Sequence, residues 1–380
     1  MKRLKIKYNE IACKSNIYKA FVNSATGKRK RRQVKQVFKN LEFYANKICA
    51  MLKDKTYKPS PYIQKRTFEG SSHKERIIFK PRYNPDQIIH HALMNVIEPY
   101  LRRKMYYYSC SSIQGKGIHF GANRIKKILK KDYKGTKYCF KLDIRKFYPS
   151  VDKELLKTKF RGIIKDKDIQ WLINTIIDSH EQGIPIGNYT SQWFANFYLH
   201  DLDMAIIHEL KPHYYLRYAD DMVIIDSNKR RLHKIKDFIE KFLLEKEHLI
   251  MKDNWQIFRL DSRPLDFLGY KFYKKNSILK CGNDKAIKPF TTLRGKIFLR
   301  ITRRIRKIAK KVRMTYSDAA TSISYYGWFI HCNFRKFYEK YIKPFIDLKK
   351  AKGVIRKWQR QQLMKDQSKG SKSKECLTMV

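Results

Sequence analysis

The stretch YYLRYADDMVII, residues 214–225, decides the fold of this chain. Strand-forming apolar residues at 214–216 and 222–225 flank the segment 218–221, which predicts a β-hairpin with Asp220 and Asp221 at its tip. Adjacent carboxylates on a tight turn between buried strands repel each other and lose hydration. A divalent cation such as Mg²⁺ removes that cost, because it prefers hard oxygen ligands. The alternative is a solvated acidic turn.

A third carboxylate favours the metal interpretation. Asp143 ends the alternating, strand-like run YCFKLD at residues 138–143. One acid from this strand and two from the hairpin could hold two Mg²⁺ ions about 3.5–4 Å apart, the arrangement used for in-line phosphoryl transfer. One ion would lower the pKa of an attacking 3′-hydroxyl, and the other would neutralise leaving pyrophosphate. Taken alone, Asp143 could equally be a strand-end cap.

The charge of the chain indicates a polyanionic partner. Its 380 residues include 85 Lys and Arg against 34 Asp and Glu, a formal net charge of +51. Nucleic acid is the simplest polyanion to satisfy such an excess. An aromatic content of 14% and a hydrophobic content of 43% favour a folded enzyme of two or three lobes over a histone-like binder.

Other site classes find no support in the sequence. The seven cysteines form no C-x-x-C pair, which argues against a zinc site or a disulfide framework and fits a reducing compartment. The sequence has no H-E-x-x-H motif, no signal peptide and no apolar run of bilayer length. We therefore expect a cytoplasmic protein without a membrane partner.

Two further segments suit nucleotide contacts. HKERIIFKPR, residues 73–82, is a basic strand in which the Arg76 guanidinium could bind a triphosphate, although a solvated strand face is the plain alternative. In RKFYPS, residues 145–150, the aromatic Tyr148 could lie against the sugar of a nucleotide and exclude a 2′-hydroxyl. An ordinary core aromatic is the alternative there.

Apolar periodicity predicts the flanking elements. A strand pair is expected near 266–272, a strongly basic helix at 294–313 begins a small helical domain, and the lysine- and serine-rich end is expected to be disordered. Further helices are expected at 86–104, from the end of the glycine-rich stretch 115–121 to about 131, and at 153–164, 168–180 and 229–247.

In their order, these motifs resemble those of reverse transcriptases. The resemblance runs from roughly Arg76 to Phe272 and comprises Asp143 in K-L-D-I-x-x-F-Y, a G-x-x-x-S turn and Y-A-D-D. It implies an α+β, right-handed fingers-palm-thumb polymerase with an antiparallel palm sheet flanked by helices and a helical thumb. The implied parts are an N-terminal extension with fingers at 1–135, a palm at 136–285 with fingers at about 160–190, a thumb at 286–350 and a basic disordered tail at 351–380.

The resemblance also implies residue roles. Asp143, Asp220 and Asp221 would be the metal ligands, assisted by the carbonyl of Ile144, for two Mg²⁺ ions or alternatively Mn²⁺. Lys252 matches the proton donor to pyrophosphate, and Tyr148 matches the steric gate. The remaining implied contacts are with the nucleotide, by Lys74, Arg76, Phe147, Ile186, Gly187 and Gln192, and with the primer, by Phe267, Leu268, Gly269 and Tyr270.

One departure from the common pattern points to a subclass. Most reverse transcriptases carry Q-G-x-x-x-S-P where this chain has IGNYTSQ, residues 186–192. Aliphatic Ile186 and terminal Gln192 resemble reverse transcriptases of diversity-generating retroelements, which are bacterial, archaeal or phage-encoded. This implies error-prone copying of a template-repeat RNA into cDNA, with misincorporation opposite adenine, for mutagenic retrohoming. It also implies dNTPs, a primer strand and a small basic oligomeric accessory protein as partners.

Two alternatives stay open at this point. The chain could be a group II intron-like, retron or defence-associated reverse transcriptase. It could also be a non-catalytic RNA-binding protein with a polymerase-like palm, against which the intact, mutually repulsive trio of aspartates argues.

Overall fold

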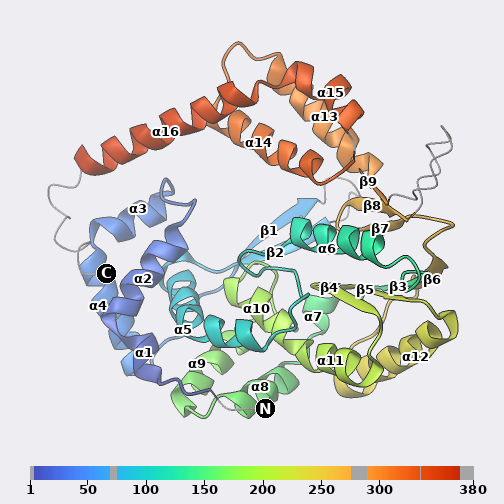
Figure 1. Ribbon diagram of the computed structural model, residues 1–380. Helices are drawn as coiled ribbons and strands as arrows, with labels where there is room; N and C mark the ends of the chain where they lie inside the picture. Colours follow the sequence, from blue (N-terminus) through green and yellow to red (C-terminus); the bar gives the residue numbers. More distant parts are fainter. Residues whose placement is uncertain (1–3, 69–74, 275–288, 334, 369–380) are drawn as a thin grey trace. The chain divides into compact units, whose positions relative to one another are not determined.

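We describe a computed structural model of the chain, covering residues 4–68, 75–274, 289–333 and 335–368. Helices and strands both contribute, as the sequence predicts (Figure 1). Two compact units can be distinguished, and each is described by itself. The first comprises residues 1–114, 140–224 and 230–256, and the second comprises 115–139, 225–229 and 257–380.

The N-terminal part of the first unit is helical. Its core is formed by apolar faces such as Ile17, Phe21 and Leu93, each fully buried. Helix α2 packs on α5, and the basic run at 28–32 leads into the short α3. The helices of this part are α1 (Tyr8–Ala12), α2 (Lys14–Ala25), α3 (Arg32–Lys39), α4 (Leu41–Lys53) and α5 (Ile88–Lys104), with a π-helical turn η1 (Tyr83–Gln87) before α5.

An antiparallel hairpin precedes α5. Strand β1 (Ile63–Phe68) pairs with β2 (Glu75–Lys80), with Ile63 opposite Lys80 and Thr67 opposite Arg76. Most side chains of both strands are exposed. The pair therefore contributes little to the core of the unit.

Helices α7 to α11 complete the helical part of the first unit. Asp152 and Asp166 cap α8 and α9, because each carboxylate accepts backbone N–H groups of the first turn. Helix α10 packs on α5 and α8, and Phe160, Phe194 and Phe197 form an aromatic cluster between α8 and α10. The elements are α7 (Phe147–Ser150), α8 (Lys153–Ile163), α9 (Lys167–Asp178), α10 (Tyr189–Tyr198), α11 (His200–Ala205) and η2 (Ile206–Leu210).

The central sheet carries the acidic hairpin. Its strand order is β4-β5-β3-β6, from β4 (Tyr214–Tyr218), β5 (Asp221–Asp226), β3 (Tyr138–Leu142) and β6 (Gln256–Arg259). In β5 the residues Met222 to Ile225 are fully buried. Helix α12 (Lys229–Lys246) approaches the sheet where Lys236 lies over Trp255, whose ring contacts Phe140 of β3. The order places β3, and so Asp143 at its end, next to β5.

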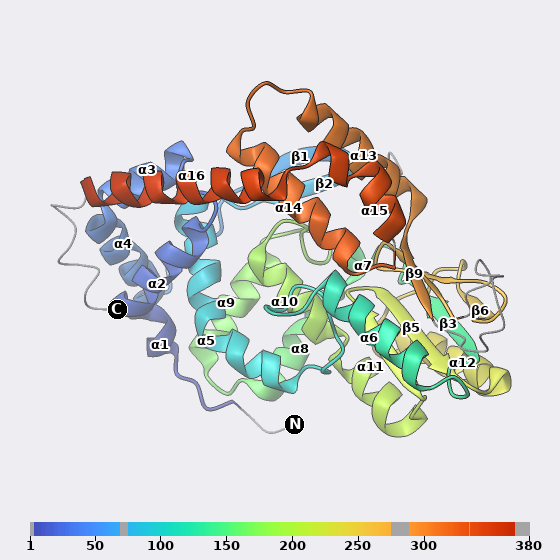
Figure 2. The same ribbon diagram turned by 45° about the horizontal axis from the view of Figure 1, so that its top comes forward.

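The second unit combines a small sheet with helices (Figure 2). Strand β8 (Tyr270–Tyr273) pairs antiparallel with both β7 (Leu265–Phe267) and β9 (Phe290–Leu293). Helix α14 packs on α13 and α16, and its N-cap Thr315 forms a capping box with Asp318. The helices are α6 (Ile118–Lys131), α13 (Gly295–Ala309), α14 (Tyr316–Ile330), α15 (Arg335–Tyr341), the 3₁₀ turn η3 (Lys343–Phe345) and α16 (Leu348–Ser368).

One expectation is wrong in this region. Residues 351–368 form most of α16 rather than a disordered tail. The physical reason is an apolar stripe that the basic composition conceals: Ala351 is fully buried and Trp358 stacks on Tyr316 of α14 at 4.1 Å. Residues 369–380 lie outside the described part. The four-part division into extension, palm, thumb and tail stays a prediction.

Candidate active site

The acidic hairpin has the geometry that the sequence predicts. Strand β4 ends at Tyr218, Ala219 and Asp220 make the turn, and β5 begins at Asp221. Ala219 has φ +55°, a left-handed conformation that non-glycine residues seldom adopt. This constrained backbone fixes the orientation of Asp220 and Asp221 at the turn.

Asp143 is placed by backbone pairing with a distant segment. The Lys252 amide donates to the Asp143 carbonyl at 2.9 Å, the Arg145 amide donates to the Ile250 carbonyl at 2.8 Å, and Ile144 bridges to Met251 antiparallel. This register puts Lys252 beside Asp143, and their side chains form an ion pair. Lys252 therefore lies beside Asp143, and its implied role as proton donor stays a prediction.

The carboxylate of Asp143 lies close enough to act on that of Asp220. Burial, followed by the charge of Asp143, raises the pKa of Asp220 to about 6. Asp221 has a different neighbour, because its Oδ1 lies 3.8 Å from the Lys141 ammonium. Two lysines thus partly balance a cluster of carboxylates that would otherwise repel one another.

The donor set suits a divalent cation. Asp143 Oδ1 is buried and accepts no hydrogen bond within the described residues, although its carboxylate lies next to Asp220. Hard oxygen donors with unused lone pairs are what Mg²⁺ prefers. A closed cage is not formed, since no group of three or more His, Cys, Asp or Glu side chains gathers closely enough in the described part to hold an ion. Ile144 has a fully buried side chain, which leaves its carbonyl as the group that could assist.

The two aromatic candidates, Phe147 and Tyr148, have different surroundings. Phe147 is 3% exposed and packs edge-on against Tyr148 at 5.6 Å, so it belongs to the core. Burial, and then the charge of Asp220, raises the pKa of Tyr148 to about 12, with a weaker opposing influence from Arg76. Tyr148 is thus close enough to the acidic site to sense its charge. Arg76 is on the exposed face of β2, and Lys74 lies outside the described residues.

The IGNYTSQ segment contacts strand β2. The Phe79 amide donates to the Ile186 carbonyl at 2.8 Å, and Gly187 has φ +130° with its Cα against the Phe79 carbonyl. Asn188 donates to the Tyr62 hydroxyl at 2.7 Å and precedes α10. Gln192 is exposed on the first turn of that helix. The structure therefore brings Ile186 and Gly187 to β2, the strand that carries Arg76.

The expected primer-contacting residues form the β7–β8 hairpin of the second unit. Phe267 pairs with Tyr270 across a turn in which Leu268 has φ +54° and Gly269 has φ +81°. Phe267 and Tyr270 are buried, and the Tyr270 hydroxyl lies 2.9 Å from His119 Nδ1. Buried rings fix the hairpin to its unit, and at the turn the Gly269 carbonyl accepts a hydrogen bond from the Arg294 amide at 2.9 Å.

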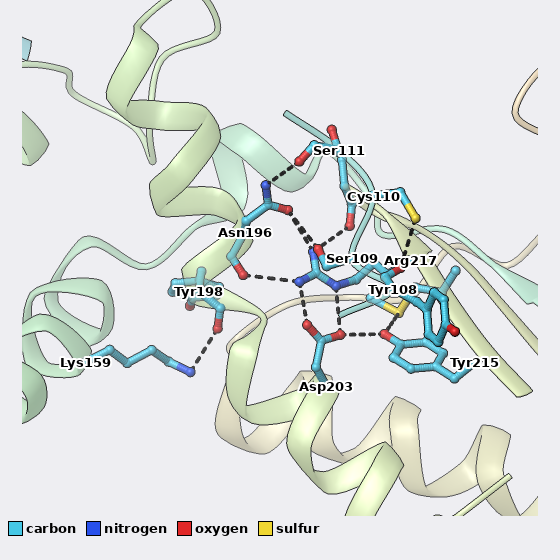
Figure 3. A network of polar contacts seen from close by, with 12 residues as sticks. Tyr108, Ser109, Cys110, Ser111, Lys159, Asn196, Tyr198, Asp203, Tyr215 and Arg217 are labelled. Carbon is cyan, nitrogen blue, oxygen red and sulfur yellow. Dashed lines mark hydrogen bonds and ion pairs between the residues drawn. The ribbon is translucent and has the colours of Figure 1, made fainter. Parts of the chain in front are cut away.

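Sequence reasoning missed a buried ionic network beneath the acidic turn (Figure 3). Arg217 of β4 and Asp203 of α11 are both fully buried and form a bidentate ion pair. A usable signal was present, because an arginine interrupts the apolar run YYLRY and an aspartate lies in the apolar helix that follows α10. A charge inside an apolar run needs a buried partner.

Comparison with known protein families identifies the family of this chain. Residues 64–272, more than half of the chain, match the family model described as reverse transcriptase (RNA-dependent DNA polymerase). The chain belongs to the reverse transcriptase family. The matched span contains Asp143, Asp220 and Asp221 as well as Arg76 and Lys252. The family that the motifs predicted is thereby confirmed.

Curated relatives of this reverse transcriptase family member are distant. Retron Ec73 reverse transcriptase of Escherichia coli is 32% identical over 123 residues, covering 29% of this chain and 39% of that protein. Group II intron-encoded protein LtrA of Lactococcus lactis subsp. cremoris is 22% identical over 329 residues, covering 67% and 53%. The chain thus spans about half or less of the length of these relatives.

A solved structure is similar to this chain, and the hydropathy of the described helices is a separate finding. Apo telomerase from Candida Tropicalis is similar at 13% identity with a TM-score of 0.46, over 73% of this chain and 56% of that one. None of the described helices combines the length and apolar character needed to cross a bilayer.

Proposed function

We propose that the chain is an RNA-directed DNA polymerase that extends a primer with dNTPs on an RNA template. The observation that carries this is the adjacency of Asp143 and Asp220 in a partly buried acidic site, within a chain that belongs to the reverse transcriptase family. Asp143, Asp220 and Asp221, with the Ile144 carbonyl, would hold two Mg²⁺ ions, or Mn²⁺ in their place. Bound there, the ions would activate the primer 3′-hydroxyl and neutralise pyrophosphate.

The other side chains have roles around that reaction. Lys252, which pairs with Asp143, would be the acid that protonates the leaving pyrophosphate. Tyr148, close to Asp220, would contact the sugar and reject a 2′-hydroxyl. Arg76 and Lys74 would bind the triphosphate, and the turn at Leu268 and Gly269 would contact the primer.

Primer extension on a defined RNA template tests this proposal. With Mg²⁺ and dNTPs, the wild-type chain should give full-length cDNA and Asp220→Asn should give none. The same Asp220→Asn chain should still retard the primer–template in a gel-shift assay, because the positive surface is unchanged. Extension by both proteins, or by neither under any metal condition, would contradict the proposal. The second result would favour the non-catalytic RNA-binding protein.

At a finer level, we propose that the enzyme belongs to a diversity-generating retroelement. This rests on Ile186 and Gln192 in the IGNYTSQ segment. An aliphatic side chain cannot hydrogen-bond the incoming nucleotide, and one lost contact of this kind is worth about 1 kcal/mol, or several-fold in selectivity. The proposal includes a template-repeat RNA and a small basic accessory protein that forms an oligomer. Adenine-directed misincorporation comes from the family resemblance alone.

A retron or group II intron-like enzyme is the second candidate. It is favoured by the curated relatives, which carry those names. Sequencing cDNA made on a template with all four bases separates the two. Errors concentrated at template adenines, and reduced by Ile186→Gln, support the diversity-generating subclass. Accurate or evenly erroneous cDNA, unchanged by Ile186→Gln, supports the second candidate.

A further inference from the structure

Arg217 has no solvent contact and yet carries a full positive charge. Its side chain is 0% exposed. Its Nε donates to Asp203 Oδ1 at 2.8 Å and its Nη2 to Asp203 Oδ2 at 2.5 Å. Burial lowers the pKa of Arg217, but the charge and the hydrogen bonds of Asp203, with smaller contributions from Tyr215 and Cys110, raise it overall, so the guanidinium stays charged.

The remaining donors of Arg217 bind backbone and amide groups that surround the catalytic turn. Nη1 donates to the Ala219 carbonyl at 3.2 Å and to Asn196 Oδ1 at 3.1 Å, and Nη2 also donates to the Asn196 carbonyl at 3.2 Å. Figure 3 shows the guanidinium between α10, α11 and the end of β4. A single side chain thus joins two helices to the turn that carries Asp220.

The backbone of β4 is held from its other side as well. The segment after α5 runs parallel to β4: the Cys110 amide donates to the Arg217 carbonyl at 2.8 Å, and the Arg217 amide donates to the Tyr108 carbonyl at 3.2 Å. Asn196 Nδ2 donates to the Ser111 carbonyl at 2.9 Å, so the same amide holds this segment and Arg217. The strand before the turn therefore has little freedom to shift.

Stability alone is a poor reason to bury this pair. Taking two charges out of water is costly, and apolar residues of similar volume often stabilise a core equally well. The turn supplies another reason. Ala219 keeps φ +55° without being glycine, a strained conformation that needs surrounding contacts to persist. The bond from Arg217 to the Ala219 carbonyl is such a contact.

We propose that Arg217 is a positioning residue for Asp220. Neutralised by Asp203 and oriented by Asn196, its guanidinium holds the Ala219 carbonyl and so fixes the direction in which Asp220 leaves the turn toward Asp143. The ligand concerned is the divalent cation of the proposed polymerase, and in this respect the inference rests on the proposed function. Arg217 itself contacts neither the cation nor the substrates.

Three variants test the role. Arg217→Lys keeps a positive charge opposite Asp203, but one ammonium cannot bind Asp203, Asn196 and the Ala219 carbonyl together. Arg217→Met removes the charge. The matched control is Lys159→Met, which breaks another ion pair, with buried Glu247 at 2.8 Å and half-exposed Asp201 at 2.7 Å, and whose ammonium makes no bond to Arg217 or to the Ala219 carbonyl.

The decisive readout does not need catalysis. Binding of Mn²⁺, followed by the electron paramagnetic resonance signal of the free ion, reports the acidic site directly. We expect Arg217→Lys to weaken Mn²⁺ binding about tenfold, which corresponds to about 1.4 kcal/mol. We also expect kcat of primer extension to fall while KM for dNTP and primer–template affinity stay near wild type. Lys159→Met should keep Mn²⁺ affinity and kcat even where its Tm is lower.

Two results would overturn the inference. One is wild-type Mn²⁺ affinity and kcat in folded Arg217→Lys. The other is an equal loss in Lys159→Met at a matched loss of Tm, because that would assign the effect to general destabilisation. Where Arg217→Met fails to fold, Arg217→Lys decides. A wild-type chain that binds Mn²⁺ and extends no primer would refute the proposed function, and the Mn²⁺ affinities of the variants would still decide the role of Arg217.

Discussion

The backbone amide of Phe79 donates a 2.8 Å hydrogen bond to the carbonyl of Ile186. One residue comes from the exposed hairpin strand β2, which carries Arg76, and the other from the turn before α10. Sequence separation gives no hint of this contact. The hydrogen bond makes the conformation of the Ile186 turn depend on β2. A displacement of β2 or of the turn would therefore alter the position of the residues proposed to bind the nucleotide.

The first prediction concerns Gly187, which makes that contact sterically possible. A Cβ at Gly187 would lie 2.3 Å from the Phe79 carbonyl oxygen, and its φ of +130° disfavours any L side chain. We expect Gly187→Ala to lower the free energy of unfolding by about 1–3 kcal/mol. We also expect KM for dNTP to rise, because the turn must move off β2. Urea unfolding and steady-state primer extension measure the two effects.

Gly162 offers a matched control for this substitution. It lies in α8, and a Cβ there would meet nothing within 4 Å. Gly162→Ala should therefore leave KM unchanged and stabilise the helix by up to about 1 kcal/mol. Equal behaviour of the two variants would show that the contact with Phe79 does not constrain the turn.

Lys252 gives the second prediction. Its ammonium pairs with Asp143, and the backbone of the two residues is paired as well, so a shorter or neutral side chain leaves the strand register intact. We expect Lys252→Met to reduce kcat by about 10²-fold, the usual contribution of a positioned general acid. Mn²⁺ should bind this variant at least as tightly as wild type, since a competing cation has been removed.

Lys141→Met serves as the comparison for Lys252. It removes the other lysine near the carboxylates, which lies 3.8 Å from Asp221. Loss of charge alone would affect both variants alike, whereas a proton donor is lost only in Lys252→Met. Similar kcat values for the two variants would therefore refute the specific role of Lys252.

The acidic site and most elements could be predicted because their signals are local. Apolar alternation identifies the strands around Ala219, and 3.6-residue periodicity placed the helices at 153–163 and 167–178 within about two residues. The ion pair between Asp203 and Arg217 could not be predicted from local signals, because it depends on how α11 packs on β4. The helix at 351–368 was not predicted for a similar reason. Its apolar stripe becomes recognisable only when Trp358 is known to pack on Tyr316 of α14.

The β7–β8 turn gives the third prediction. Gly269 has φ +81°, and a Cβ there would lie 2.7 Å from Ile297 Cδ1 and 2.9 Å from the Trp328 ring. The hairpin would have to move away from α13 and α14. We expect Gly269→Ala to weaken primer–template binding several-fold and to destabilise the chain by about 1–3 kcal/mol. A fluorescence-anisotropy titration with labelled primer–template measures the binding.

Gly327 is the matched control in the same unit. It lies within α14, and a Cβ there would meet nothing within 4 Å. Gly327→Ala should therefore preserve binding and raise helix stability slightly. If Gly269→Ala binds primer–template as wild type does, the turn is not the primer contact.

The fourth prediction is a pH dependence of stability that originates at His90. This residue of α5 is 1% exposed, and burial, followed by His91, lowers its pKa to about 3. The unfolded chain binds a proton near pH 6.5 and the folded chain does not, so the contribution of His90 is intact above that pH and is lost as the pH falls. At pH 5 the loss amounts to about 2 kcal/mol.

His90→Phe keeps a planar ring and removes this titration. Between pH 7 and pH 5 its free energy of unfolding should therefore fall by about 2 kcal/mol less than that of wild type, as measured by urea unfolding at each pH. Residual dependence is expected from His91, whose pKa burial lowers to about 4. An identical slope in His90→Phe and wild type would mean that His90 is protonated in the folded chain.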